Sequence, residues 1–443
     1  MPGGFGLITR ILPLHQMSYT TVMINKLERY IQTGLLVILA LMPFHAFLSV
    51  WLGHIFGHES EIEAWKELVL LALTALALLL IRADRQRLER LRRPWIVATG
   101  IFALLALAVT AITRPGLTAA AFGIKTDLEF LLAAVLATLV ASPTFMRRSI
   151  HAVLIGAGAV TSFGLLEIFV LPRNFLDAFG YGPATLMPYE LISGTNTPRF
   201  AATLGGPNQL GTYLILPLAL SLMLAIRRKQ WWWLALTATG SVVLAATYSR
   251  SAWIGAVAAL ALTLVVSLPT RWRMRTVAVL VVLGVAGAGS LAVLATRNTH
   301  LHAYLFHQNP ASANLRPSSD AQHVSSVRTS LRDIAGRPLG HGLGSAGPAT
   351  FRAGVVHIVE NYYLQIGYET GVAGALLFIA LFGLLIAALW PQAPPLGPVI
   401  AAALAGVGLA ALVLPAWTDS STALIAWILA GAVAGLKSKA AYV

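Results

Sequence analysis

The chain contains no cysteine. This absence excludes disulfides, thiolate catalysis and iron–sulfur or cysteine-type zinc sites. Charged residues are also scarce: they make up 11% of the 443 residues, whereas 57% are hydrophobic and the mean hydropathy is +0.75. Ordinary soluble domains carry about 25% charged residues. The composition therefore predicts a polytopic membrane protein.

Acidic residues are scarcer than basic ones, with 17 Asp and Glu against 31 Lys and Arg, and the formal net charge is +14. A positive charge of this size can indicate nucleic-acid binding, but most of the basic residues fall in short loops between apolar runs. That placement is typical of membrane topology. We therefore expect a lipid bilayer as partner and no nucleic acid.

Motifs for nucleotide and metal chemistry are missing too. The chain has no Walker-type phosphate loop and no HExxH motif, and its histidines do not follow the spacing of a zinc site. We expect no cofactor and no metal. Residues 1–24 lack a compact apolar segment followed by a small-residue cleavage site, so we expect no cleavable signal peptide.

Long apolar runs are abundant, and runs of about 17–25 residues predict about twelve transmembrane helices. The expected fold is an all-α membrane helix bundle. The predicted spans lie near residues 31–51, 65–81, 95–112, 124–141, 150–171, 208–226, 231–248, 252–268, 276–295, 361–390, 398–415 and 420–436.

Basic clusters orient these spans, because Lys and Arg concentrate in cytoplasmic loops. With this number of spans the clusters all fall on one side, and both termini are cytoplasmic. The clusters are Lys26 and Arg29, Arg82 to Arg93, Arg147 and Arg148, Arg227 to Lys229, Arg271 to Arg275, and Lys437 and Lys439. The resulting segments are a cytoplasmic extension (1–30), helices 1–9 (31–295) with an outer loop at 172–207, a large outer loop (296–360), helices 10–12 (361–436) and a cytoplasmic tail (437–443).

The large outer loop has an excess of arginine and histidine over acidic residues, which suggests that an anionic group binds at the membrane surface. In its second half Val324, Val327, Leu331 and Ile334 recur at helical spacing and predict a short amphipathic helix. This helix would carry Arg328 and Arg332, and two guanidinium groups match a diphosphate better than point charges do. The alternative is that both arginines form its solvated face.

Two more arginines stand at the outer ends of spans. Arg199 lies just before a span, where an arginine needs an anionic partner or must extend outward, so it is an interfacial anchor or a binding residue. The turn that ends at Asn208 precedes a helix, and its backbone N–H groups favour an anion. Arg250 lies in a hairpin, where it either caps the preceding helix or contacts a ligand.

A general base is expected near the end of the large loop, where His341, His357 and Glu360 are the candidates. Glu360 stands at the beginning of a span beside Asn361 and close to Tyr363. Partial burial would raise its pKa toward the range of a general base, and a plain N-cap role is the alternative. The histidines expected to be solvated are His300, His302, His307 and His323.

Four stretches follow one another in the chain: NTPRFAATLGGPNQLGTYLILPLAL, ATYSRSAWIG, SSVRTSLRDIAGRPLGHGLGSAG and VENYYLQIGYETGVAG. Together they resemble the O-antigen ligase and polymerase family of bacterial inner-membrane glycosyltransferases, over roughly residues 190–390. The resemblance implies a GT-C-like helix bundle with a large periplasmic loop. It also implies a glycan donor on undecaprenyl diphosphate and transfer to a hydroxyl without nucleotide or metal. By position, the family's arginine before the Pro-Asn turn falls on Arg199 and its loop arginine on Arg328.

The chain departs from the family at one position. Ligases of the family place a His-Asn or His-Ser pair where this chain has Glu360 and Asn361. Either Glu360 or His357 then takes the role of the base, with His341 behind them. If residues 357–360 are helical, both candidates point toward one side.

The expected activity is that of an O-antigen ligase, which transfers the glycan to a lipid A–core hydroxyl for lipopolysaccharide biosynthesis. The enzyme would lie in the bacterial inner membrane with its active site on the periplasmic face. The alternatives are an O-antigen polymerase, a protein O-oligosaccharyltransferase and, from another class, a transporter of lipid-linked glycans. A transporter is expected to show repeat symmetry and polar groups at the midplane of the membrane.

Overall fold

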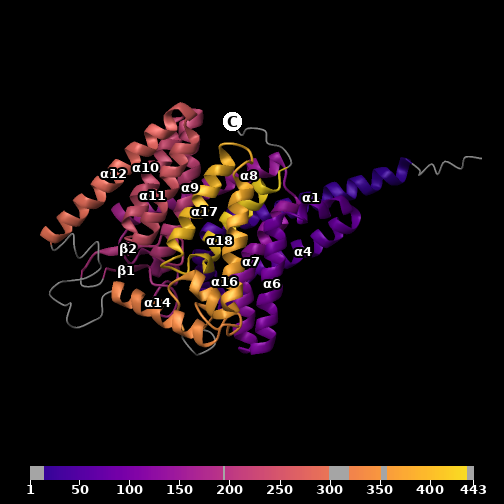
Figure 1. Ribbon diagram of the computed structural model, residues 1–443, viewed down its shortest axis with the longest axis horizontal. Helices are drawn as coiled ribbons and strands as arrows, with labels where there is room; N and C mark the ends of the chain where they lie inside the picture. The colour runs from indigo at the N-terminus through magenta and orange to yellow at the C-terminus, as the bar shows by residue number, and fades with distance from the viewer. Residues whose placement is uncertain (1–13, 193–194, 299–318, 351–356, 437–443) are drawn as a thin grey trace, which may run out of the picture.

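The computed structural model describes residues 14–192, 195–298, 319–350 and 357–436. Figure 1 shows a bundle of helices with a single small sheet at one side. The sheet pairs β1 (Tyr189–Leu191) with β2 (Pro198–Phe200) in antiparallel register. The expected all-α polytopic fold is therefore confirmed in the part of the chain that is described.

The predicted spans fall on helices, the first of them (31–51) across the end of α1, the turn η1 and the beginning of α2. The main helices are α1 (Leu14–Leu41), α2 (His45–Phe56), α3 (Glu59–Glu63), α4 (Trp65–Ala83), α5 (Leu88–Leu91), α6 (Pro94–Thr113), α7 (Leu117–Leu139), α8 (Pro143–Phe169), α9 (Pro207–Arg228), α10 (Trp231–Ala246), α11 (Arg250–Ser267), α12 (Thr270–Arg297), α14 (Ser319–Gly336), α16 (Tyr362–Leu389), α17 (Leu396–Ala410) and α18 (Ser420–Ala434). The 3-10 turns are η1 (Met42–Phe44), η2 (Arg85–Arg87), η3 (Phe175–Phe179) and η5 (Ala416–Thr418).

Two boundaries differ from those expected. Helix α1 begins at Leu14 and runs through the predicted boundary at residue 30 without a break. The predicted outer loop at 172–207 contains η3 and the two strands. In this sheet Tyr189 pairs with Phe200, Glu190 with Arg199 and Leu191 with Pro198.

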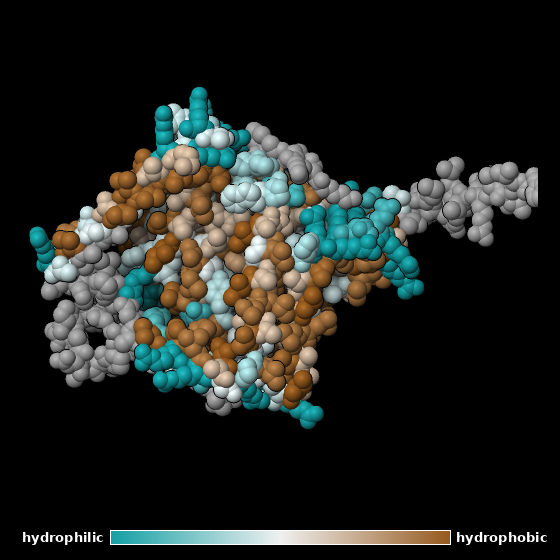
Figure 2. Space-filling model, viewed as in Figure 1, coloured by the Kyte–Doolittle hydropathy of each residue, from teal (hydrophilic) through white to brown (hydrophobic). Residues whose placement is uncertain are grey.

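By length and composition, 7 of the described helical segments can cross a membrane, and α10, α17 and α18 are shorter apolar helices. Figure 2 shows the consequence, with hydrophobic residues over the middle of the bundle and hydrophilic residues gathered at its ends. A bilayer around the middle would satisfy both kinds of surface.

The core is centred on α18, whose residues are almost all buried. A helix that is apolar on every side must be surrounded by other elements. Its Trp427 ring packs 5.0 Å from the ring of Phe130 on α7 and 6.0 Å from that of Phe382 on α16. Elsewhere α11 and α17 meet at Gly255 and Gly406, where a Cβ on Gly255 would lie 2.3 Å from the Gly406 carbonyl oxygen. Small residues allow this close approach of membrane helices.

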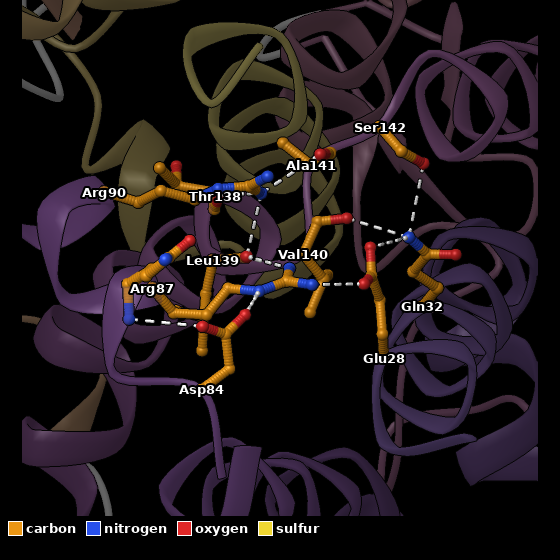
Figure 3. A network of polar contacts seen from close by, with 11 residues as sticks. Glu28, Gln32, Asp84, Arg87, Arg90, Thr138, Leu139, Val140, Ala141 and Ser142 are labelled. Carbon is orange, nitrogen blue, oxygen red and sulfur yellow. Dashed lines mark hydrogen bonds and ion pairs between the residues drawn. The ribbon is translucent and has the colours of Figure 1, made fainter. Parts of the chain in front are cut away.

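The basic cluster between α4 and α6 closes one end of the bundle. Arg90 Nη1 donates to the Leu139 carbonyl at 2.9 Å, and Arg87 Nη1 donates to the same oxygen at 3.1 Å (Figure 3). Arg87 Nη2 also lies 2.5 Å from Glu28 Oε2 on α1. These arginines bind carbonyl groups that the end of α7 leaves without helical partners. The cluster that serves as a topology signal in the sequence is thus also a helix cap.

Candidate active site

The polar elements of interest lie at the opposite end of the bundle, which we call the cavity end. It carries the β1–β2 sheet, α14, the loop at 337–350 and the beginnings of α9, α16 and α18. Short connections make successive helices antiparallel, so these elements meet although they are far apart in the sequence.

The loop at 337–350 is held by α16. Glu369, which is fully buried, accepts hydrogen bonds from the backbone N–H groups of Gly344 and Ala346, each at 3.1 Å. Gly371 interrupts α16 with a φ of 75°, and the following Val372 donates to the Pro338 carbonyl at 3.0 Å. At this break a backbone N–H of α16 bonds to the loop and not to the preceding turn of the helix. The GRPLGHGLGSAG sequence is thereby held against α16.

Arg199 is placed by the small sheet, where it stands directly opposite Glu190. Its guanidinium makes hydrogen bonds to Glu190 Oε2 at 2.9 Å, Asn208 Oδ1 at 2.8 Å and the Thr247 carbonyl at 2.9 Å. The residue is 9% exposed, and the Arg250 charge lies close enough to oppose it. Arg199 therefore has the anionic partner that its position requires.

Sequence reasoning missed Glu190, although a signal was present. The stretch MPYELISGTNTPRF has a turn-forming SGTN between two extended segments, and such a pattern predicts a hairpin. Pairing across the hairpin would have brought Glu190 and Arg199 together. Arg199 binds the carbonyl at the end of α10, the helix that precedes Arg250. Arg250 is the first residue of α11 and has an interaction of its own.

The predicted amphipathic helix is confirmed as α14, which carries Arg328 and Arg332 on its exposed side. However, only part of its apolar face is buried against the bundle. Ile334 is buried and packs toward Gly367 on α16, whereas Val324 and Leu331 are 61% and 52% exposed. The exposed residues line, with both arginines, a shallow groove of about 560 Å³. This groove combines an apolar floor with two guanidinium groups.

His341 and His357 both stack on Tyr368 of α16. The ring centroids lie 4.0 Å apart for His341 and 4.4 Å apart for His357. His341 Nδ1 lies 3.1 Å from the Tyr368 carbonyl oxygen. Burial lowers the pKa of His357, which favours a neutral imidazole at neutral pH.

Residues 357–360 are not helical, so the condition under which His357 and Glu360 would point toward one side is not met. The helix begins after Asn361, whose side chain accepts from Leu364 N at 3.0 Å, so Asn361 and not Glu360 is the N-cap. Tyr363 donates to the Gly408 carbonyl at 3.0 Å. Because Asn361 is the N-cap, the Glu360 carboxylate is not used to cap α16.

Glu360 lines a cavity of about 700 Å³ at the cavity end. Its Oε2 atom lies 2.5 Å from Nδ1 of His323, which α14 carries. The expectation that His323 is solvated is therefore wrong, because the side chain is 27% exposed and its imidazole faces a carboxylate. His300, His302 and His307 lie outside the described residues.

The other walls of the cavity come from distant parts of the chain. Asn208 lines it from α9, His45 from α2, Glu59 from α3 and Asp419 from the turn before α18. No hydropathy pattern joins these segments, so sequence reasoning found only Asn208 and Glu360 of this set. His341 and His357 are not among the cavity's lining residues in the described part of the chain.

Fold and site together define a polytopic helical membrane protein with a cavity beside an arginine-bearing helix. Residues 235–379 match the family model described as O-antigen ligase, in agreement with the resemblance found in the sequence. The match includes Arg250, α14 and Glu360, and it supports ligase- or polymerase-type activity. No curated protein matches the chain.

Proposed function

We propose that this protein is an O-antigen ligase of the bacterial inner membrane. It would transfer a glycan from undecaprenyl diphosphate to a hydroxyl of lipid A–core on the periplasmic face, with both termini in the cytoplasm. The observation that carries the proposal is the position of Glu360, a carboxylate in the wall of a cavity at the end of the bundle that also bears α14. The family match to residues 235–379 supports it.

The arginines would bind the donor's diphosphate. Arg328 and Arg332 stand one helical turn apart on α14, and the exposed apolar residues beside them fit the first part of a polyprenyl chain. Arg199 lies behind Asn208 at the beginning of α9. Negative charge grows on the diphosphate as the sugar–phosphate bond breaks, so these cations stabilise the transition state more than the ground state.

Glu360 would act as the general base. In the proposed step, the acceptor hydroxyl gives its proton to the Glu360 carboxylate while its oxygen bonds to the anomeric carbon of the donor sugar. The bond from that carbon to the phosphate oxygen breaks, and undecaprenyl diphosphate leaves with the electron pair. Glu360 is preferred to His357 and His341 because it lines the cavity, whereas both imidazoles stack on Tyr368. His323 beside Glu360 would orient the carboxylate.

The test is transfer by the purified full-length protein in detergent, with a glycan on undecaprenyl diphosphate and lipid A–core as the two substrates. A lipid A–core conjugate is expected, and no membrane gradient is needed. Elongation of the lipid-linked glycan without a conjugate would instead indicate a polymerase. Absence of any transfer by folded protein would contradict both and favour a transporter.

The arginines are tested in the same assay. Arg328→Ala and Arg332→Ala are each expected to lower kcat/KM by about 10²-fold or more, because each removes a charge that stabilises the leaving group. Lysine should restore little, since it cannot make the paired contacts of a guanidinium. Full activity of both alanine variants would exclude α14 as the diphosphate site.

A further inference from the structure

The cavity that contains Glu360 has an unusual balance of charge. Four carboxylates line it, those of Glu59, Glu63, Glu360 and Asp419. Among the described residues, its lining includes no lysine or arginine. The arginines Arg328 and Arg332 line the separate groove on α14 instead. The cavity end is thus divided into a basic groove and an acidic cavity, with Glu360 in the wall of the latter.

Several of these carboxylates are held in place by neighbours. Asp419 Oδ2 accepts the backbone N–H of Thr422 at 2.9 Å and thereby caps α18. Glu63 Oε1 lies 3.4 Å from Lys125 Nζ on α7. Glu59 is exposed, lines the cavity and takes part in no ion pair within the described residues, so its charge is not compensated by a partner there. Two of the four carboxylates, Asp419 and Glu63, are therefore held in place by neighbours.

Uncharged hydrogen-bonding groups in the cavity point to a hydroxyl-rich ligand. Ser49 on α2 lines the cavity, is 6% exposed, and its hydroxyl has no hydrogen-bond partner among the residues described. Asn208 accepts from Arg199 through Oδ1, which leaves the amide NH₂ as the end that can donate elsewhere. A buried hydroxyl without a partner is costly unless a ligand satisfies it.

Carboxylates and neutral donors in one cavity suit a sugar. Carboxylates accept hydrogen bonds from sugar hydroxyls and ammonium groups, but they repel phosphate and carboxylate groups, which are negatively charged at neutral pH. A site can select a ligand by repelling its competitor as well as by binding the right one. The lining is therefore suited to a neutral or amine-bearing sugar.

We infer that this cavity is the subsite for the acceptor sugar, and that its carboxylate wall selects an accepting sugar with neutral or amine substituents and rejects one with phosphate or carboxylate beside the accepting hydroxyl. The inference rests on the proposed glycan transfer and deepens it. It places the acceptor hydroxyl against Glu360, while the donor's diphosphate stays with Arg328, Arg332 and Arg199, none of which lines the cavity. The arginines favour the anionic diphosphate of the donor, whereas the carboxylates favour a neutral or cationic acceptor sugar. Each substrate is therefore disfavoured at the other's site.

The test compares two synthetic lipid-anchored oligosaccharide acceptors that differ only in one substituent, a hydroxyl or a phosphate on the carbon next to the accepting hydroxyl. The full-length protein in detergent and the same lipid-linked donor are used with both. We expect kcat/KM to be at least about tenfold higher for the neutral acceptor, because of repulsion by the acidic wall.

Glu59→Gln should narrow this ratio several-fold by speeding transfer to the phosphorylated acceptor, since it removes one wall charge. Glu61→Gln is the matched control, because Glu61 lies on the same short helix, is largely exposed and is not among the cavity's lining residues. The control should leave the ratio unchanged. Retained thermal midpoints would confirm that both variants fold.

Equal or faster transfer to the phosphorylated acceptor would overturn the inference, and so would a ratio that Glu59→Gln leaves unaltered. Neither result would contradict the proposed function, because glycan transfer itself would still occur. If no acceptor of either kind receives glycan, the proposed function fails instead.

Discussion

Arg199 and Glu190 face each other across a two-stranded sheet, with Nη1 of the arginine 2.9 Å from Oε2 of the glutamate. Arg199 is buried, whereas the Glu190 side chain is 52% exposed. Glu190 is therefore the half of the pair that an incoming anion could displace. If the donor's diphosphate reaches Arg199, it would do so by replacing this carboxylate.

The first prediction follows from that pair. Glu190→Gln should lower the free energy of unfolding by about 1–2 kcal/mol, because a buried guanidinium loses its counter-charge. Donor or a diphosphate analogue should then raise the thermal midpoint of the variant more than that of the wild type. An equal or smaller rise would show that the diphosphate does not reach Arg199. Glu61→Gln, in an exposed glutamate at another site, serves as the control for loss of charge.

The second prediction concerns the base. Glu360→Gln should lower kcat by about 10²–10⁴-fold with little change in KM for the donor, since only proton transfer is lost. His357→Gln should reduce kcat far less, because its ring stacks on Tyr368 and is not part of the cavity wall. Single-turnover transfer measures the chemical step directly. A wild-type rate for Glu360→Gln, together with a large loss of rate in His357→Gln, would identify His357 and not Glu360 as the general base.

The third prediction is a pH dependence. Burial lowers the pKa of His357 below its ordinary value of 6.5, while Asp333 opposes the shift and His341 adds to it. The unfolded chain therefore binds the proton more readily, so the stability contributed by neutral His357 is present above about pH 6.5 and declines as pH falls through the folded pKa.

Thermal midpoints at about pH 7.5 and about pH 5.5 test this dependence. Replacing His357 by Phe keeps an aromatic ring against Tyr368 and removes the titration, so the midpoint should fall less on acidification than in the wild type. His58→Gln, in an exposed histidine, is expected to behave like the wild type. A drop in His357→Phe as large as that in the wild type would assign the acid sensitivity to other groups.

The fourth prediction concerns the loop that α16 holds. Gly344 has a φ of 79°, and a Cβ there would lie 1.8 Å from the Ala119 carbonyl oxygen. Gly344→Ala should therefore destabilise the protein by at least about 2 kcal/mol, from the left-handed backbone and the displaced loop. Activity should fall with it, since the same loop leads to Glu360.

Gly336→Ala is the matched control, because no atom lies within 4 Å of the added carbon at the end of α14. Urea or thermal unfolding of the two variants in detergent would measure the difference. Similar stability in both would mean that the loop at 337–350 shifts without cost.

The architecture could be predicted because its causes are local in the sequence. Apolar runs mark the transmembrane helices, since unpaired backbone groups cannot remain in hydrocarbon. The period of apolar residues marked α14, and the arginines it carries were found with it. The division of its apolar face could not be found, because periodicity does not tell which of Ile334 and Leu331 meets α16.

The site was only partly predictable. Arg199 was singled out because a cation near hydrocarbon needs an explanation, but its partner Glu190 depended on a hairpin that hydropathy does not reveal. Glu360 was singled out by its position at the start of a span. Its contact with His323 joins two segments of the large loop, and no spacing rule predicts that distance.

The sequence by itself determined the class of protein, the positions of its helices and the resemblance to the O-antigen ligase family, because hydropathy, basic clusters and ordered motifs are properties of contiguous residues. Only the tertiary structure decided which candidates line the cavity. Glu59, Asp419 and Glu360 come from three distant segments, and they meet because antiparallel helices bring every second connection to the same end of the bundle. The direction of side chains at that end depends on the N-cap Asn361 and on the kink at Gly371. Both change how α16 meets other segments, which the local sequence does not show.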